Sequence, residues 1–185
     1  VESETVWAES KAKERVGQNF VKSILELSGY KVMNYGIENH NMQIIKMIKG
    51  NYSSETNQRL MCMPDYVVVD PETKESRLVE VKYRQLPEYF NWKKTNFMFK
   101  YRTIHNYLEH WNDLVLVFAL NVKPFCICVD MDKIDWNIHF LGKHENKTGQ
   151  KDEIWNFTGL YQLINEAFPL VTSKCFQKAC EISNF

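Results

Sequence analysis

Three ionisable residues, Asp65, Glu80 and Lys82, stand in segments whose composition is that of buried strands. An unpaired carboxylate inside such a strand is costly. Two carboxylates that face each other can instead share a divalent cation, since hard cations such as Mg²⁺ bind carboxylate oxygens. A neighbouring lysine can orient a water molecule or stabilise charge that develops on a phosphate. The alternative is an ion pair of Lys82 with Glu80 beside a turn aspartate. We favour the metal site.

A predicted β-hairpin brings these residues together. The segments 61–70 and 75–84 are rich in strand-forming residues and flank a Pro-Glu-Thr-Lys turn. A four-residue loop makes the numbers of facing residues sum to 145. Facing residues of an antiparallel pair have Cβ atoms about 5 Å apart, and alternate residues share a face. The expected facing pairs are Asp65 with Glu80 and Met63 with Lys82.

The same residues carry a resemblance to a known family. Pro64 and Asp65, followed after a spacer by Glu80, Val81 and Lys82, resemble the signature of the PD-(D/E)xK nuclease superfamily, which includes restriction endonucleases and archaeal-type Holliday junction resolvases. The resemblance implies Mg²⁺ or Mn²⁺ held by Asp65 and Glu80, with the main-chain carbonyl of Val81 as a further ligand. It implies that Lys82 orients the attacking water or stabilises the transition state.

The first helix departs from the family pattern. Resolvase-like members carry a glutamate on this helix, about eleven residues before a glycine that precedes the first strand. Counting back from Gly29 leads to Gln18, with Glu14 one turn earlier. Two alternatives stay open: Gln18 acts as a neutral substitute or supporting residue, or Glu14 serves as the metal ligand.

Hydrophobic periodicity and turn signals predict the remaining elements. The first helix should carry an inward stripe of Val16, Phe20, Val21, Ile24, Leu25 and Leu27. The expected elements are a helix over 4–28, a strand over 30–36, a helix over 41–49, a loop over 50–58, the hairpin, a helix over 99–111, strands over 113–120 and 125–129, a strand or edge segment over 134–141, a surface loop over 142–151, a helix over 158–168 and a short final helix.

This order predicts one α/β domain over residues 1–185, with a central mixed β-sheet flanked by helices. Its sequence of helix, strand, hairpin, helix, strand, strand resembles the restriction-endonuclease-like core over about residues 10–130. Residues 131–185 are expected to form a C-terminal helical extension.

Basic and aromatic residues alternate between positions 85 and 100, a pattern that suits phosphate contacts and base stacking. The alternative is that the aromatic side chains are core and the lysines are solvated. The candidate phosphate contacts are Arg84, Lys93, Lys94 and Arg102.

Together these features predict a Mg²⁺- or Mn²⁺-dependent endonuclease, and the resemblance favours DNA over RNA as its substrate. The alternatives are an RNA endonuclease with the same metal site and an inactive binding module of nuclease ancestry. Lys and Arg total 23, as do Asp and Glu, and this neutral balance argues against a general nucleic-acid coat protein. Cutting both strands of a duplex would favour a homodimer. Five cysteines without paired metal-ligand spacing suggest reduced thiols and an intracellular location, cytoplasmic or in the nucleoid or nucleus, and no apolar run suits a membrane span.

Overall fold

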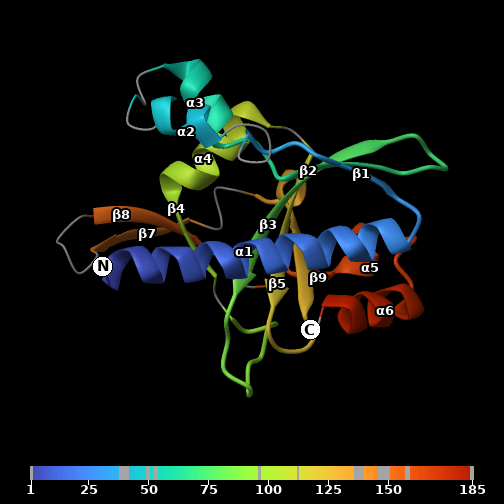
Figure 1. Ribbon diagram of the computed structural model, residues 1–185. Coiled ribbons are helices and arrows are strands. Elements are labelled where there is room, and N and C mark those ends of the chain that lie inside the picture. Colours follow the sequence, from blue (N-terminus) through green and yellow to red (C-terminus); the bar gives the residue numbers. More distant parts are fainter. Residues whose placement is uncertain are drawn as a thin grey trace.

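The computed structural model describes residues 2–37, 42–48, 51, 54–95, 97–111, 113–135, 140–145, 151–156 and 159–183. The side chains of residues 2–7, 42, 44, 98, 100–102, 140–145 and 151–156 are not described. A six-stranded sheet forms the centre of the molecule (Figure 1). In spatial order its strands are β1 (Lys31–Asn34), β2 (Tyr66–Val69), β3 (Ser76–Arg84), β5 (Leu114–Leu120), β6 (Cys126–Asp130) and β9 (Gln162–Leu163).

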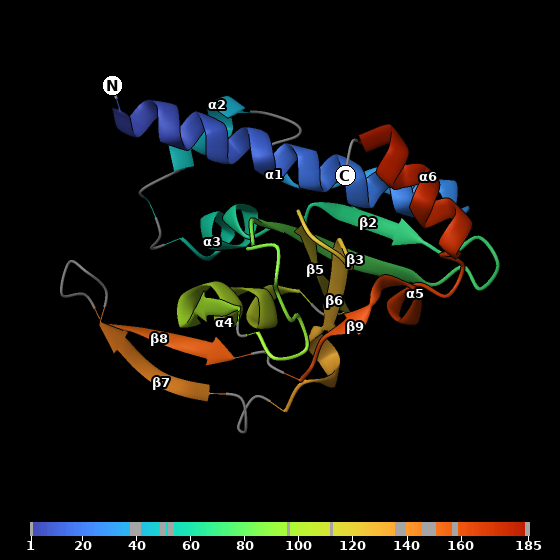
Figure 2. The same ribbon diagram turned by 90° about the horizontal axis from the view of Figure 1, so that it is seen from below.

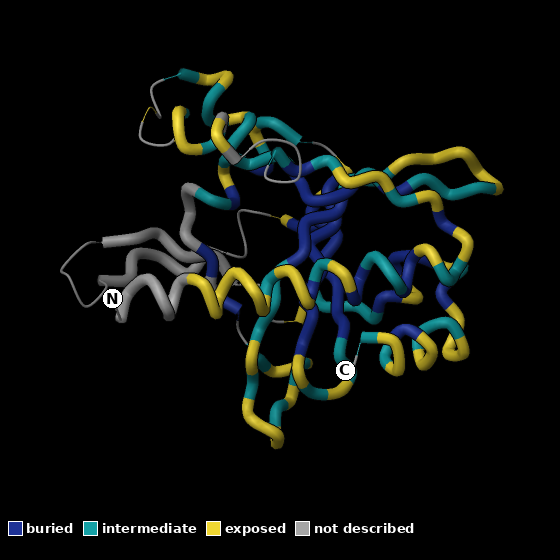
Figure 3. The backbone as a smooth tube through the Cα atoms, in the orientation of Figure 1, coloured by how far each residue is buried: buried dark blue, intermediate teal, exposed yellow. Residues whose placement is uncertain are grey.

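The sheet is open and mixed, as the α/β prediction requires. Strands β3 and β5 run parallel, and every other neighbouring pair in this sheet runs antiparallel. Each residue of β5 and β6 is buried, and these strands form the dark centre of the molecule in Figure 3. A strand buried on both faces must be covered by other elements on both sides, which explains their nearly continuous apolar sequence.

Helices cover both faces of this sheet (Figure 2). Helices α1 (Glu2–Leu27) and α6 (Ser173–Ser183) pack on one face, where Phe20 and Ile24 meet Val79 and Val81. Helix α4 (Tyr101–His110) packs on the other face, where Ile104 and Tyr107 belong to the same core as Leu116 and Phe118. Since side chains of a strand alternate between faces, β3 contributes residues to both layers.

Helix α1 ends where the sequence predicts. Gly29 has a φ of +96°, its N–H donates to the carbonyl of Glu26 at 3.0 Å, and the N–H of Tyr30 donates to the carbonyl of Leu25 at 3.1 Å. These two bonds form a Schellman cap, which glycine permits because it lacks a Cβ. The predicted stripe is wrong at Val16, which is 46 % exposed. Helix α1 approaches the sheet at Gly17 instead, and this turns Val16 outward.

The loop predicted over 50–58 is wrong at residues 55–58, and the strand predicted over 61–70 forms only at residues 66–69. Residues 50, 52 and 53 lie outside the described part of the chain. Residues Glu55–Met61 form helix α3, and the Ser54 hydroxyl accepts a hydrogen bond from the N–H of Asn57 at 3.4 Å. An N-cap serine satisfies one of the free amides of the first turn, so a polar segment can become helical without burial. Met63 follows α3 outside any strand, so the expected facing of Met63 and Lys82 is also wrong. The preceding helix, α2 (Met42–Ile48), lies within its predicted range.

The C-terminal extension is not purely helical. Strand β8 (Lys151–Asn156) pairs with both β4 (Met98–Lys100) and β7 (Phe140–Glu145) in a second, three-stranded sheet. The loop predicted over 142–151 is therefore wrong at residues 142–145 and 151, and residues 146–150 lie outside the described part of the chain. The predicted helix over 158–168 shrinks to α5 (Ile164–Ala167), because Gly159 has a φ of +84° and Gln162 and Leu163 join the sheet beside β6. The predicted final helix is confirmed as α6.

Within the described ranges, no helix combines the length and apolar character that a membrane span requires. Cys126 and Cys128 are free thiols buried on the α1 side of the sheet, as their alternate spacing on one strand predicts.

Candidate active site

The predicted hairpin register is confirmed. Tyr66 faces Val79 and Val69 faces Ser76, and the N–H of Asp70 donates to the carbonyl of Glu75 at 2.9 Å. One step beyond the last pair, this register sets Asp65 across from Glu80. Strand β2 begins at residue 66, whereas β3 continues to residue 84. The two acids therefore lie where β2 starts, beside a part of β3 that β2 does not cover.

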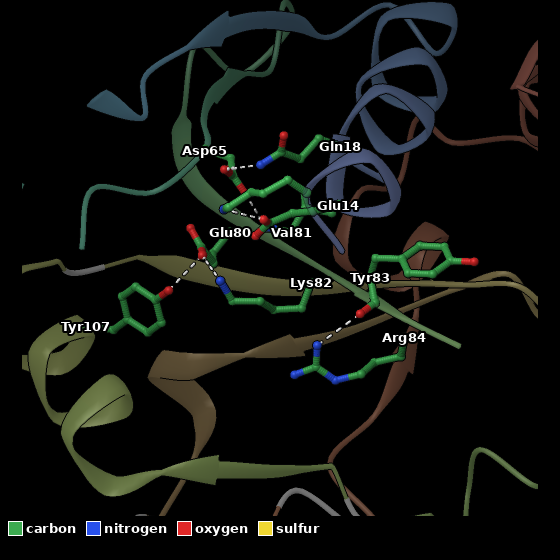
Figure 4. A network of polar contacts seen from close by, with 10 residues as sticks. Glu14, Gln18, Asp65, Glu80, Val81, Lys82, Tyr83, Arg84 and Tyr107 are labelled. Atoms are coloured by element: carbon green, nitrogen blue, oxygen red, sulfur yellow. Dashed lines mark hydrogen bonds and ion pairs between the residues drawn. The ribbon is translucent and has the colours of Figure 1, made fainter. Parts of the chain in front are cut away.

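The Asp65 carboxylate is held between helix α1 and strand β3. Its side chain is almost fully buried, with 3 % of the residue exposed. Oδ1 accepts a hydrogen bond from Nε2 of Gln18 at 2.6 Å, and Oδ2 accepts one from the N–H of Val81 at 2.7 Å (Figure 4). A buried carboxylate needs such donors to offset the loss of water. Both oxygens of Asp65 thus have fixed orientations.

The Glu80 carboxylate receives two donors on one oxygen. Oε1 accepts a hydrogen bond from the hydroxyl of Tyr107 at 2.7 Å and forms an ion pair with Nζ of Lys82 (Figure 4). The Glu80 side chain is 8 % exposed and that of Lys82 is 21 % exposed. Oε2 takes no part in these two contacts, so it is the oxygen of Glu80 that can turn to a ligand.

The charges of Lys82 and Tyr107 follow from their surroundings. Burial by itself would lower the pKa of Lys82, but Glu80, Tyr107 and Asp65 together outweigh burial and raise the pKa well above its usual range. Burial and the Glu80 charge both raise the pKa of Tyr107. Lys82 therefore stays cationic and Tyr107 stays a hydrogen-bond donor at neutral pH. A lysine that holds its proton this firmly acts by charge and not as a general base.

The structure brings Gln18, and not Glu14, to Asp65. The Glu14 carboxylate turns to Lys11, with Oε2 2.5 Å from Nζ, and its side chain is 30 % exposed. Burial lowers the pKa of Arg84, and the nearby charge of Glu14 partly offsets this. Glu14 thus lies on the Arg84 side of the site, one helical turn from the contact that Gln18 makes.

The donor set fits a magnesium-like cation with few protein ligands. Among the residues that the structure describes, no group of three or more His, Cys, Asp and Glu side chains gathers in a metal-binding arrangement. Mg²⁺ commonly keeps several waters and binds through one or two carboxylates together with substrate phosphates. Asp65 and Glu80 face each other in the register and supply two such carboxylates. Gln18 is placed to orient Asp65, since groups that hydrogen-bond a ligand fix its direction.

The predicted phosphate contacts divide into two groups. The Arg84 guanidinium lies over the rings of Phe99 and Phe118, at 5.4 and 6.0 Å from their centres, and Nη1 donates to the carbonyl of Tyr83 at 2.9 Å. Arg84 is therefore partly committed to packing. Lys93 and Lys94 are exposed in the turn after β3. The side chain of Arg102 lies outside the described part of the chain.

Tyr107 is the site residue that sequence reasoning missed. It lies on α4, 27 positions from Glu80, and is 5 % exposed. The available signal was helical spacing, because Ile104 and Tyr107 lie three residues apart on the face that meets the sheet. Nothing local shows that the hydroxyl on this face meets a carboxylate.

Comparison with known proteins does not assign this chain to a family. A scan against protein-family models finds no match, and no curated protein matches the chain. The site consists of two buried carboxylates on the two strands of one hairpin, a lysine that remains charged, and a tyrosine and a glutamine that orient the acids.

Proposed function

We propose that this chain is a metal-dependent nuclease with a restriction-endonuclease-like core. The observation that carries the proposal is the position of Asp65 across from Glu80 in the hairpin register, with Lys82 beside Glu80 on the same face of β3. Both carboxylates act to raise the pKa of Lys82, so the three side chains form one charged group. The order of α1, β1, β2, β3, α4, β5 and β6 supports the same core.

Each residue has a distinct role in this proposal. Asp65 and Oε2 of Glu80 would hold Mg²⁺ or Mn²⁺, with the main-chain carbonyl of Val81 as a further ligand. The metal, when bound, supplies a water of lowered pKa and neutralises charge on the attacked phosphate. Lys82 supplies a fixed positive charge for the phosphate as negative charge builds up in the transition state. Gln18 orients Asp65, and Tyr107 orients Glu80.

The motif contacts the phosphate and not the sugar, so the substrate is proposed from the resemblance. We take DNA as the substrate class because the resemblance is to DNA-cutting enzymes, and a homodimer as the form that would cut both strands.

A binding module of nuclease ancestry is the second candidate, and one observation favours it. Gln18 and Val81 satisfy Asp65, and Lys82 and Tyr107 contact Glu80, without any metal. A site whose charges are balanced by protein groups can persist as a structural feature.

A cleavage panel decides between these candidates. Wild type and Lys82→Ala would be incubated with labelled single-stranded DNA, duplex DNA, four-way-junction DNA and RNA, each with Mg²⁺, Mn²⁺ or EDTA. Lys31→Ala, an exposed lysine on β1, is the matched control. We expect metal-dependent cutting by wild type and by the control, and a loss of at least about 100-fold in Lys82→Ala, the size of effect seen when a transition-state donor is removed.

The variant needs a check on folding, because removing Lys82 leaves the Glu80 charge buried beside one donor. Breaking a buried pair in this way costs about 3–5 kcal/mol. The double variant Lys82→Met with Glu80→Gln removes both charges and should keep the fold, as judged by circular dichroism, while it remains inactive. Cutting by this folded double variant would refute the proposed mechanism. The absence of cutting by wild type on every substrate would support the binding module.

A further inference from the structure

A small pocket lies beside the loop that follows β3, the strand that carries Glu80 and Lys82. It has a volume of about 190 Å³ and is lined by Trp92, Lys93, Gly159 and Tyr161. Trp92 and Lys93 belong to the loop that follows β3, which hangs below the sheet in Figure 1, and Tyr161 precedes β9. The pocket thus joins the aromatic and basic segment of the sequence to the C-terminal part of the chain.

The pocket offers aromatic rings and a cation. Nζ of Lys93 lies 5.4 Å from the centre of the Trp92 ring. The Tyr161 ring packs edge-on against Phe97 at 5.5 Å, and its hydroxyl accepts a hydrogen bond from the N–H of Phe97 at 3.1 Å. Burial raises the pKa of Tyr161 to about 12, so its ring stays neutral. Gly159 has open space where a Cβ would stand.

A continuous row of side chains connects this pocket with the candidate active site. Glu80, Lys82 and Arg84 share one face of β3 because alternate residues of a strand do so. Arg84 lies over the ring of Phe118, and that ring meets Tyr161 at 6.0 Å between centres. From Glu80 to Arg84 the strand rises about 13 Å at about 3.3 Å per residue. The pocket therefore lies toward the Arg84 end of β3, the end away from Ser76.

We propose that this pocket binds an unpaired nucleobase of the substrate strand by stacking on Trp92 and Tyr161, while Lys93 contacts a neighbouring phosphate. The inference rests on the proposed nuclease function and narrows its substrate class to single-stranded or locally unpaired nucleic acid. A base inside a duplex is already stacked, and it enters such a pocket only when it is unpaired or flipped out. Stacking on an aromatic side chain contributes about 5- to 150-fold to binding per base.

Binding is measured in EDTA, so that no cleavage can occur. A fluorescently labelled single strand and the duplex of the same sequence and length would be titrated with wild type, and the anisotropy would be recorded. We expect the single strand to bind more tightly than the duplex. Trp92→Leu keeps an apolar side chain but removes the stacking surface, and should weaken single-strand binding by about 5- to 150-fold. Trp92→Phe keeps a ring and should retain most of the affinity.

Two neighbouring lysines test whether the charge of Lys93 contributes to binding. Lys93 lines the pocket and Lys94, the next residue, does not, while both are exposed. Lys93→Ala should weaken binding of the single strand more than Lys94→Ala. Tyr89 is 96 % exposed on the same loop and does not line the pocket. Tyr89→Leu is therefore the aromatic control and should leave the affinity for the single strand unchanged. Because Lys93 is exposed, this comparison holds even if Trp92→Leu unfolds.

The outcomes separate this inference from the proposed function. Equal affinity for single strand and duplex, or equal losses of affinity in Lys93→Ala and Lys94→Ala, would refute base binding in the pocket even if wild type cuts nucleic acid. A loss confined to Trp92→Leu and Lys93→Ala, with the control Lys31→Ala binding like wild type, would support base binding in the pocket even if no cutting were found.

Discussion

Gln18→Glu tests the candidate metal site through stability, without any need for a substrate. Nε2 of Gln18 donates to Oδ1 of Asp65 at 2.6 Å. The substitution keeps the size of the side chain but replaces this donor with a second carboxylate. Two unit charges 4 Å apart at an effective dielectric constant of 20 repel by about 4 kcal/mol. The lost hydrogen bond to a charged group is worth about 1.5–3 kcal/mol.

The variant can relieve part of this repulsion by turning the half-buried side chain or by keeping a proton. We therefore expect the free energy of unfolding to fall by about 2–4 kcal/mol at pH 8 in EDTA. Repulsion raises the folded-state pKa of the carboxylate pair above the unfolded value of about 4.3 for glutamate. A raised carboxyl pKa means that stability is lost as pH rises from that value through the folded-state pKa. The deficit should accordingly shrink near pH 4.

Metal should reverse the deficit. If Asp65 holds a divalent cation, the new carboxylate adds an oxygen ligand, and a ligand that binds only the native state stabilises it by RT ln(1 + [L]/Kd). Urea denaturation at pH 8 with Mn²⁺ should then show a larger gain in Gln18→Glu than in wild type. Glu14→Gln, one turn away on the same helix, is the control and should change neither the pH dependence nor the response to Mn²⁺. Equal stability of wild type and Gln18→Glu at pH 8 in EDTA, or equal gains with Mn²⁺, would refute the reasoning.

Three further predictions concern the packing and charges around the sheet. Tyr107→Phe removes a hydrogen bond to the buried Glu80 carboxylate. Urea denaturation should show that the free energy of unfolding falls by about 1–3 kcal/mol, and Mn²⁺ should bind more weakly. An unchanged free energy of unfolding together with unchanged Mn²⁺ affinity would contradict an orienting role. Gly17→Ala sets a Cβ 3.2 Å from Cβ of Tyr83. The overpacking cost of about 1–3 kcal/mol should exceed the gain of about 1 kcal/mol in helix propensity, so the thermal unfolding midpoint should fall. A rise in the midpoint would contradict this. Burial by itself would raise the pKa of Asp130, but the hydrogen bonds and charges of Arg77 and Lys133 outweigh burial and lower this pKa. Asp130→Asn should therefore be less stable than wild type at pH 7, and urea denaturation should show the difference narrowing below about pH 4; a constant difference would count against it.

Local pattern was sufficient for the hairpin that carries the site. A four-residue turn and the two-residue period of strands set the register, so the pairing of residues 66–69 with residues 76–79 could be predicted from residue numbers alone. Gly29 likewise marked the end of α1, because a left-handed cap is a local backbone property. The buried strands β5 and β6 could be predicted from their continuous apolar runs.

Segments whose partners are distant in sequence were predicted poorly. Strand β8 pairs with both β4 and β7, and β9 adds to the edge of the main sheet beside β6. A polar or mixed segment becomes a strand when an existing edge supplies hydrogen-bond partners, and nothing within the segment encodes that edge. This is why a loop and a helix were expected where strands occur.

The sequence by itself determined that Asp65 and Glu80 belong to one hairpin, because the geometry of a hairpin is local. Only the tertiary structure decided which further side chains complete the site. The close approach of α1 at Gly17 to Tyr83 sets the rotation of the helix, and that rotation brings Gln18 to Asp65 while Glu14 turns to Lys11. The packing of α4 on the opposite face brings Tyr107 to Glu80. Both choices depend on how a helix rests on a sheet, which is a property of the packed core and not of the helix sequence.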